Sequence, residues 1–581
     1  LAVTGAILEH SESGVAGTLS VVRNDRVPIR TAPGLSLQSM TMPPRQLAVF
    51  IDGDAIGTLY ANDSGDKSSE YLKDLVSALP YRLLAHPRVA VLNAGTGLGV
   101  EQAIWLGAAS VNAIEPNPQL RALNCRHPDR PDPKRCGSKV EWHTQSARAF
   151  IAASHAEFDL ITLALHADAS GLDALKTNYD LTQEAVASYL DRLAPDGLLA
   201  IEGPTRLPPR LSLRTINTAR VALGKLGIDE PGKHLAVIRG WQRFVLLASR
   251  TPLDAARVTK IRSFSGVNGF DLIWLPDIRP DEPNRYQQLS EPQYYLQARA
   301  ILDPAGRRPG GGPTTRYRLH AAGDDIPFPN RFTSWTEGWS ALRHGDRASL
   351  SQIDTGLVVA TATLAIVTIS GILLILLPLL WRGNPARPPA PLGQGLRTLL
   401  YFFLLGIAFL FIEMAWIQRL QLFLGLPVYA TTAVLLTFLV FAGLGSLWSQ
   451  NRSGVQARRG LLFAVVAILL SSLIYLVYVP SWLAAAADLS LAARGVLVLV
   501  LLAPLAFAMG IPFPTGLRDL GQTSPQLIPW AWGINGCASV ISAASAPLLA
   551  MEIGFNGLIS VAVLAYLILP AIRIDHAPAG A

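Results

Sequence analysis

Three glycines and one acidic residue have the spacing of a nucleoside-binding turn. The apolar run 89–92 predicts a buried strand, and Gly95, Gly97 and Gly99 follow it directly. Glycines in this place let the backbone turn tightly and come close to a ligand at the start of the next helix. Glu115 lies about twenty residues further on, at the end of a second predicted strand, where its carboxylate could accept both hydroxyls of a ribose.

Each of these groups has a second explanation that the sequence leaves open. Glycines also persist where a strand-to-helix turn needs them for its own geometry. Glu115 could equally be a solvated carboxylate at a strand end. A glycine motif alone is weak evidence for a nucleotide site, so the surrounding strands predict the fold more firmly than they predict the ligand.

The elements that would position these groups form an α/β pattern. Residues 86–250 alternate strands and helices, as expected for a Rossmann-like, doubly wound parallel sheet. Beyond the glycine turn, we expect strands at 159–165 and 197–201 and a helix at 182–193. This stretch would be one domain with the glycine turn at the edge of its sheet.

Two less regular segments flank this domain. Residues 1–85 predict a small β-rich lead-in, and residues 251–353, rich in proline and glycine, predict an irregular extension toward the membrane. Within the lead-in we expect strands at 17–22 and 47–51 and a helix at 69–79.

The rest of the chain has the composition of a membrane protein. The sequence is 50% hydrophobic and 16% charged, with a mean hydropathy of +0.32, and long apolar runs recur after Gly356. We expect an all-α polytopic domain over residues 354–575 with about seven spans. Their ranges are 355–380, 398–418, 427–449, 460–484, 492–512, 531–551 and 556–572.

The positive charge predicts the orientation of these spans. The net charge is +7, but the sequence has no basic stripe interleaved with aromatics, so we do not expect nucleic acid as a partner. If all seven segments cross, eight arginines lie on one side and four on the other, including the approach to the first span. The first set is Arg382, Arg387, Arg397, Arg452, Arg458, Arg459, Arg518 and Arg573, and the second is Arg343, Arg347, Arg419 and Arg494. By the positive-inside rule, the soluble half would lie outside the cytoplasm.

The cysteines bear on the same question of compartment. Cys125 and Cys136 bracket a proline-rich loop, and their separation permits a disulfide that would contribute about 3 kcal/mol in an oxidising compartment. Two unpaired thiols are the alternative. We expect no metal site, because His127 and His143 lack the paired spacing of zinc ligands.

Long ordered blocks of the sequence resemble the spermidine synthases, and the chain as a whole looks like the bacterial membrane-bound spermidine-synthase-like proteins. The matching blocks include IDGDAIGT at 51–58, VLNAGTGLG at 91–99, NYDLTQEAVASYLDRLAPDGLL at 178–199, GIAFLFIEMAWIQRLQLFLGLP at 406–427 and MGIPFPTGLRDL at 509–520. This resemblance implies a class I methyltransferase fold and a place in the bacterial inner membrane. It also implies S-adenosylmethionine, or its decarboxylated form, as the cofactor of an active member.

The resemblance also implies which positions should do the chemistry. Active synthases transfer an aminopropyl group to putrescine, and an aspartate at the end of the third strand helps deprotonate and position the amine. Here Ala164 takes that position, with Asp168 nearby but out of register, and Ser146 stands where a second aspartate contacts adenine. The amine-holding tyrosine and glutamine correspond to about Val15 and Ile56. Burying a polyamine cation against such residues would leave its charge unpaired, so polyamine synthesis is disfavoured.

Two polar features remain outside this scheme. His166 and Asp168 could form another acid–base pair, although a polar loop explains them as well. Glu413 lies near the end of a predicted span, where it could be an interfacial carboxylate satisfied by Gln418 and Arg419, or part of an ion or substrate pathway.

Three functions therefore stay open. The first is a catalytically degenerate, membrane-anchored structural or accessory subunit that binds no cofactor, which the loss of the aspartate at Ala164 favours. The second is an active transferase with an unknown acceptor. The third is a transporter with a nucleoside-sensing domain. Expected partners are the lipid bilayer and further membrane subunits or an upstream membrane segment, because the chain begins with Leu1.

Overall fold

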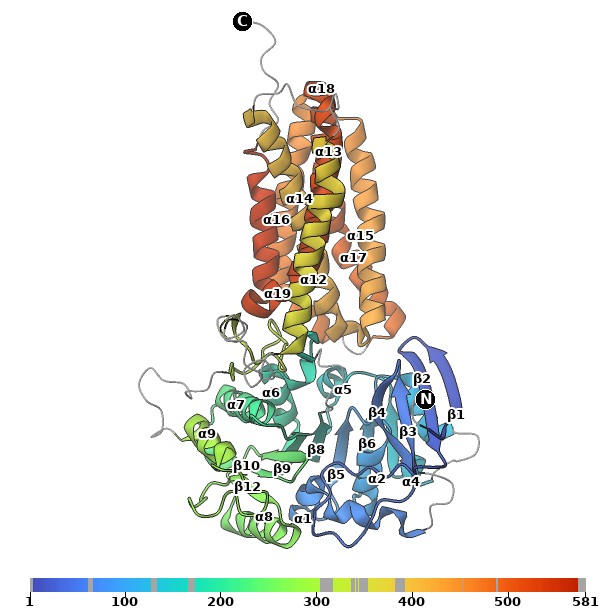
Figure 1. The fold of residues 1–581 in the computed structure, drawn as a ribbon, viewed down its shortest axis with the longest axis vertical. Helices are drawn as coiled ribbons and strands as arrows, with labels where there is room; N and C mark the ends of the chain where they lie inside the picture. The colour runs from blue at the N-terminus through green and yellow to red at the C-terminus, as the bar shows by residue number, and fades with distance from the viewer. Residues whose placement is uncertain are drawn as a thin grey trace, which may run out of the picture. The chain divides into compact units, whose positions relative to one another are not determined.

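The chain divides into two compact units, Leu1–Asp354 and Thr355–Ala581. A computed structural model describes residues 4–60, 66–126, 133–165, 173–303, 317–335, 354–381, 392–452, 454–486 and 489–572, together with residues 340 and 343. The first unit contains both sheets, and the second is helical (Figure 1).

The first unit opens with a four-stranded antiparallel sheet in the order β1-β2-β3-β4. Its strands are β1 (Ala6–Gly14), β2 (Gly17–Asn24), β3 (Gln46–Ile51) and β4 (Asp54–Tyr60). Alternate residues of β2 and β3, such as Leu19 and Val49, are buried and pack against Leu120 and Leu123 of helix α3 (Pro118–Arg126). The small sheet therefore rests on the helix that follows the predicted ribose-binding strand.

The helix expected over residues 69–79 differs in the structure. The segment forms two 3₁₀ helices, Asp66–Asp74 and Val76–Ala78, and an α-helix, α1, covers only Leu79–Leu83. Pro80 lies in the first turn of α1, where a missing backbone N–H costs nothing, so the α-helix starts there.

The second sheet has eight strands in the order β12-β10-β11-β9-β8-β5-β6-β7. Five of them run parallel: β5 (Arg88–Leu92), β6 (Ser110–Ile114), β7 (Val140–His143), β8 (Phe158–Ala164) and β9 (Leu193–Pro204). The other three join antiparallel: β10 (Leu235–Arg239), β11 (Arg243–Ala248) and β12 (Asp271–Trp274). The mixed sheet with parallel strands is that of a Rossmann-like methyltransferase fold, and it continues past residue 250 through β12.

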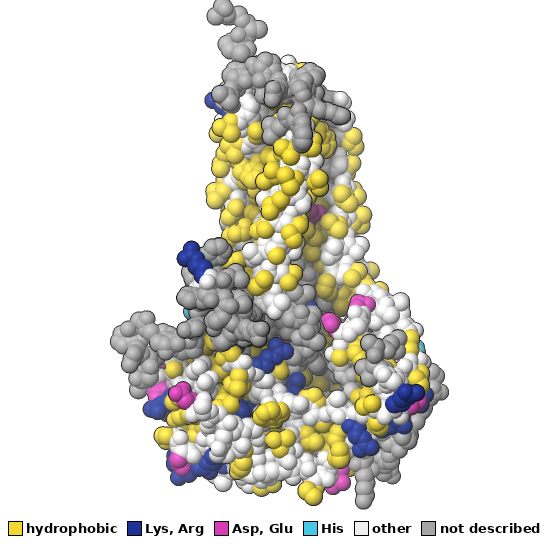
Figure 2. Space-filling view, viewed as in Figure 1, with side chains coloured by type: hydrophobic (Ala, Val, Ile, Leu, Met, Phe, Trp, Pro, Cys, Tyr) yellow, Lys and Arg dark blue, Asp and Glu magenta, His cyan; other side chains and the backbone are white. Residues whose placement is uncertain are grey.

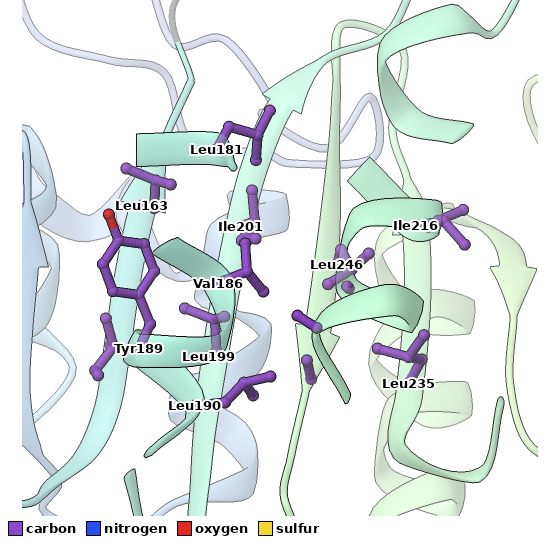
Figure 3. Close-up of a cluster of buried hydrophobic side chains, with 14 of the residues drawn as sticks. Leu163, Leu181, Val186, Tyr189, Leu190, Leu199, Ile201, Ile216, Leu235 and Leu246 are labelled. Atoms are coloured by element: carbon purple, nitrogen blue, oxygen red, sulfur yellow. The ribbon is translucent and has the colours of Figure 1, made fainter. Parts of the chain in front are cut away.

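Successive side chains of the central strands point alternately into two separate hydrophobic cores. Ala90 and Leu92 face the core covered by α5 (Ala147–Ala153), α6 (Gln183–Asp191) and α7 (Arg210–Lys225), and Figure 3 shows Tyr189 of α6 against this face. Val89 and Val91 face the opposite core, which α1, α2 (Leu98–Trp105) and α8 (Ala255–Asn268) cover. Burial on both faces explains why these strands are continuously apolar.

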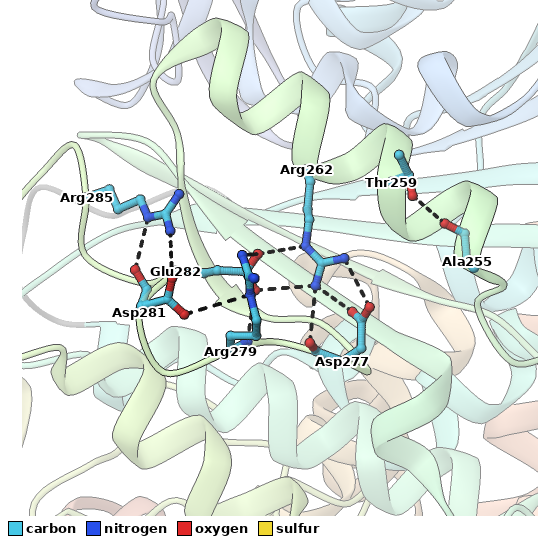
Figure 4. A network of polar contacts seen from close by, with 8 residues as sticks. All are labelled: Ala255, Thr259, Arg262, Asp277, Arg279, Asp281, Glu282 and Arg285. Carbon is cyan, nitrogen blue, oxygen red and sulfur yellow. Dashed lines mark hydrogen bonds and ion pairs between the residues drawn. The ribbon is translucent and has the colours of Figure 1, made fainter.

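Two arginines bind irregular segments of the first unit to helices that cover the sheet. Arg214 of α7 is buried and donates to the carbonyls of Phe328 at 3.0 Å and Pro329 at 2.7 Å, and burial lowers the pKa of its guanidinium to about 9. On the surface, Arg262 of α8 pairs with Asp277 at 2.7 Å and Glu282 at 2.8 Å, which ties α8 to the loop after β12 (Figure 4).

Among its described residues, the second unit contains six helices that are long and apolar enough to cross a membrane: Thr355–Leu379, Gly393–Leu424, Pro427–Gln450, Gly454–Tyr478, Leu491–Thr523 and Pro525–Ile568. Its helices are α12 (Thr355–Gly371), continued by a π-helical turn and α13 (Leu377–Trp381), then α14 (Leu392–Leu424), α15 (Pro427–Gln450), α16 (Gly454–Ala485), α17 (Leu491–Met509), α18 (Pro512–Thr523) and α19 (Ile528–Ile568). Hydrophobic side chains dominate the visible face of this unit (Figure 2). This chain is a membrane protein.

The expected count of about seven spans is not confirmed, because the last two predicted spans fall within α19. Gly554 interrupts α19 with φ 76° and ψ 174°. Asn535, before the break, donates to the carbonyl of Phe402 in α14 at 3.0 Å, and Asn556, after it, accepts from Arg419 of the same helix. At 1.5 Å per residue, the stretch 555–568 is only about 21 Å long, shorter than a hydrocarbon core of about 30 Å.

Candidate ligand site at the carboxyl edge of the sheet

The glycine loop joins β5 to α2 and contains three glycines in different surroundings. A Cβ on Gly97 would lie 2.4 Å from Oδ1 of Asn124, and one on Gly99 would lie 3.3 Å from the side chain of Val91. A Cβ on Gly95 would meet nothing closer than 3.8 Å. Gly97 is therefore required by packing and Gly99 is in tight contact with Val91, whereas the backbone at Gly95 is open enough for a ligand to approach.

Glu115 directly follows β6 and is bound to the same loop. Its Oε2 accepts from the amide of Gly95 and its Oε1 from the amide of Asn117, both at 2.8 Å. The residue is only 5% exposed, so the alternative of a solvated carboxylate is wrong. Burial raises the pKa of Glu115 to about 7, although the two amide hydrogen bonds oppose that shift. A carboxylate has about four acceptor positions, so two are left for other donors such as ribose hydroxyls.

Two buried side chains hold the glycine loop from behind. Asn124 of α3 donates to the carbonyl of Gly95 at 2.9 Å, and Arg135 donates to that of Thr96 at 2.8 Å. Arg135 also pairs with Glu101 of α2 at 2.8 Å, and both side chains are almost fully buried. Neither residue was predicted from the sequence, in which they stand out only as the neighbours of Cys125 and Cys136.

The disulfide lies beside these two supports. Cys125 and Cys136 are joined, with their Cα atoms 5.6 Å apart, so Asn124 and Arg135 are each the neighbour of a bonded cysteine. Cys136 ends the short helix α4 (Pro133–Cys136). His143, the other histidine weighed for zinc, hydrogen-bonds Asn112 at 2.9 Å instead. No group of three or more potential metal ligands occurs in the part of the chain that the structure describes.

Ser146 has a local structural role. Its hydroxyl accepts from the amide of Ala149 at 3.2 Å and caps the start of α5. Serine is a favoured N-cap residue because it satisfies one of the free amides of the first turn. This role accounts for Ser146 without an adenine.

A cavity of about 190 Å³ lies next to the loop, at the carboxyl ends of the central strands. Its lining includes Asn93 and Gly99 of the loop region, Ala164 of β8, Glu202 of β9 and Arg243 of β11. Glu202 is the only acidic residue among the described residues of this lining. The carboxylate of Glu202 pairs with the Arg243 guanidinium at 2.5 Å, and Arg243 also donates to the carbonyl of Leu165 at 2.9 Å. The cavity therefore offers a neutralised ion pair in place of a free negative charge.

The structure brings together only part of the site expected from the resemblance. Ala164 and Ile56 both line the cavity, whereas Val15 is 46% exposed and lies in the turn between β1 and β2. Asp168 and His166, the weak candidates for catalysis, lie outside the described residues.

The polar features of the helical unit are largely accounted for by packing. Glu413 is buried in α14 with 7% of its surface exposed. The small residues of α19 serve close packing within the unit, since a Cβ on Gly406 of α14 would lie 2.7 Å from the carbonyl of Asn535. Ser542 donates to the carbonyl of Ala538 in the same helix at 2.8 Å and to the carbonyl of Gly406 in α14 at 3.4 Å.

Comparisons with known proteins find likeness only among solved structures, because no family model and no curated protein matches the chain. A spermidine synthase in complex with the transition-state analogue AdoDATO is 12% identical, with a TM-score of 0.30 over 44% of this chain and 75% of that chain. A probable spermidine synthase from Corynebacterium glutamicum is 14% identical, with a TM-score of 0.32 over 54% of this chain and 99% of that one. Human methyltransferase-like protein 13 in complex with SAH is 13% identical, with a TM-score of 0.25 over 34% and 92%. At these values the likeness concerns fold and not activity.

Proposed function

We propose that this chain is a membrane-anchored, spermidine-synthase-like protein that no longer makes polyamines and acts as a structural or accessory subunit of a membrane assembly. The observation that carries this proposal is the charge of the cavity. Among the described residues of its lining, the only acid, Glu202, is already paired with Arg243, and Ala164 stands where the resemblance implies an aspartate.

The physical argument is the desolvation of a cation. A diamine must exchange its water for carboxylates or aromatic faces, because an unpaired buried ammonium is expensive. In this cavity it would meet Ala164, Ile56 and a guanidinium of its own sign. The nearest carboxylate would have to leave Arg243 to bind it, which would leave that arginine buried without its partner.

Location supports the same proposal. The resemblance implies a bacterial inner membrane, and with seven crossings the arginine distribution favours the extracytoplasmic side for the soluble unit. The Cys125–Cys136 bond suits an oxidising compartment. S-adenosylmethionine and its decarboxylated form are cytosolic metabolites, so a unit on that side would rarely meet them.

An active transferase is the second candidate, and the open backbone at Gly95 favours it. Gly95 and the remaining acceptor positions of Glu115 would hold the nucleoside of S-adenosylmethionine or its decarboxylated form, which would supply the group to be transferred. No residue of the described cavity offers a base for an amine acceptor. A transporter with a nucleoside-sensing domain remains the third candidate, and Glu413→Gln would have to stop transport in that case.

Calorimetric titration of the purified full chain in lipid nanodiscs separates the first two candidates. S-adenosylmethionine and its decarboxylated form are titrated into the native chain, the Glu115→Ala variant and a Glu141→Ala control, whose side chain is 76% exposed on β7. The accessory-subunit proposal predicts no binding to a folded sample. Micromolar binding that Glu115→Ala abolishes and Glu141→Ala retains would overturn it in favour of the transferase.

A further inference from the structure

The first unit exposes many large apolar side chains, and three of them lie in segments connected to the end of this unit. Leu207 is 58% exposed, Trp241 is 66% exposed and Trp335 is 38% exposed. We call these three residues the exposed apolar patch. Tryptophan combines a large apolar surface with one polar N–H, which makes it typical of surfaces that meet a lipid headgroup layer.

Leu207 and Trp241 are held next to each other by two loops. Leu207 lies in the loop between β9 and α7, and Trp241 lies in the turn between β10 and β11. Thr205 connects the loops, because its hydroxyl donates to the carbonyl of Trp241 at 2.7 Å and its amide donates to the carbonyl of Gln242 at 2.8 Å. Both side chains therefore stand at the carboxyl edge of the sheet.

Asp354 links this edge to the point where the chain becomes apolar. Its carboxylate accepts from Arg210, three residues after Leu207, at 3.4 Å. It also accepts from the amides of Phe332 and Thr333, both at 2.8 Å, and Thr333 lies two residues before Trp335. Leu207 and Trp335 are thus close in the chain to groups that bind Asp354, and Trp241 is connected to the Leu207 loop through Thr205.

The next residue after Asp354 begins the first apolar helix. The stretch Thr355–Leu379 has 25 residues with a mean hydropathy of 2.5. At 1.5 Å per residue, it is about 37 Å long, somewhat longer than a hydrocarbon core of about 30 Å. Its first residues therefore lie in or near the headgroup layer, and a group bound to Asp354 can be only a few ångströms further away.

We propose that the exposed apolar patch rests in the headgroup layer of the bilayer and makes the carboxyl edge of the sheet a lipid-contacting surface. Asp354 is bonded to this edge and is directly followed by the first apolar helix, so the edge stays close to the membrane. Exposed side chains on this edge would therefore be the first to reach lipid. Burial of two indoles and a leucine in that layer removes their apolar surface from water, which is favourable at roughly 25 cal/mol per Å². The cavity borders the same edge through Arg243, two residues after Trp241.

Nitroxide labels on the full chain in nanodiscs test this proposal. Trp241→Cys is labelled in a Cys537→Ala background, because Cys537 is the only cysteine outside the disulfide. Trp105→Cys is the matched control, since Trp105 is also an exposed tryptophan, at 42%, but ends α2 on the opposite edge of the sheet. Collisions with oxygen, which concentrates in lipid, and with a water-soluble nickel chelate are measured at each site.

The proposal predicts that the label at position 241 collides several-fold more with oxygen, relative to nickel, than the label at position 105. Equal ratios at the two sites would overturn it and place the patch in water. Low collision rates with both reagents at position 241 would also overturn it, because the patch would then be covered by protein. Leu207→Cys provides an independent second site, so the result does not depend on one variant that fails to fold.

Discussion

The two halves of the candidate site are built under different constraints. In the glycine loop, a side chain on Gly97 would clash with Asn124, and one on Gly99 would press against Val91. In the cavity beside it, Ala164 and Ile56 line open space, although Ile56 also packs against the core of the small sheet. A motif that the fold requires is retained even after the protein stops binding the ligand. Residues that serve only the reaction can change once the reaction is lost. Retention of the glycine motif is therefore weaker evidence for a cofactor than the altered cavity is against a polyamine.

The largest expected effect is on the support behind the glycine loop. Arg135→Met removes the partner of buried Glu101, and we expect a loss of about 3–5 kcal/mol in the free energy of unfolding of the first unit. Denaturant unfolding of the full chain measures it. The control is Arg88→Met, which breaks an ion pair with Asp159 whose arginine is 51% exposed, and which should lose at most about 1 kcal/mol. Equal losses in the two variants would mean that the loop is not held by this pair.

The next effect is a pH dependence that originates at Glu115. Because the pKa of Glu115 is raised to about 7, the folded state keeps a proton that the unfolded chain releases above about pH 4.5. The free energy of unfolding should therefore fall as pH rises from about 4.5 to 7, by up to about 3 kcal/mol, and then level off. Glu115→Gln should remove this slope. Asp180, whose pKa burial also raises, contributes in both proteins, so an unchanged slope in the variant would assign it to Asp180.

A pair of glycine variants separates architecture from ligand binding. Gly97→Ala combines a φ of 79° with a clash against Asn124 and should lower the free energy of unfolding by about 2–3 kcal/mol. Gly95→Ala has a φ of 55° but open space around it, and should lose only about 1 kcal/mol. Thermal unfolding of the two variants gives the comparison. If Gly95→Ala proved the more damaging, the assignment of Gly95 to ligand approach would be wrong.

The smallest expected effect is in the cavity. Ala164→Asp restores the acid of the resemblance, yet we expect putrescine to bind no more tightly than about 1 mM, because Arg243 lines the same cavity and would pair with the new carboxylate. Titration calorimetry with putrescine checks this. The double variant Ala164→Asp with Arg243→Gln leaves Glu202 and the new acid free, and it should bind measurably. Tight binding of putrescine by the single variant would contradict the proposed difference between the glycine loop and the cavity.

Local patterns predicted the parallel core well. The strands expected near 89–92 and 159–165 correspond to β5 and β8, because a short uninterrupted apolar run is typical of a parallel strand buried on both faces. The antiparallel continuation was not predicted: no strand was expected at β10 or β11, and β12 lies in the stretch 251–353 that was expected to be irregular. Element type followed from local sequence, whereas the extent of the sheet depended on pairing between distant segments.

The supports of the site could not be predicted from sequence for the same reason. Arg135 and Glu101 are 34 positions apart, and neither has a neighbouring residue that signals an ion pair. The solvated alternative for Glu115 failed because the burial of a strand end depends on the loop that folds over it. In α19, a glycine in an apolar helix is common enough that the break at Gly554 has no distinctive signature.

The position of the disulfide affects how this protein should be prepared for any ligand screen. Cys125 and Cys136 adjoin Asn124 and Arg135, the two side chains that hold the carbonyls of the glycine loop. Material expressed in a reducing cytosol would lack the tie between those two supports. A screen on such material would sample a looser loop and could miss a genuine ligand, so export to an oxidising compartment is the appropriate production route.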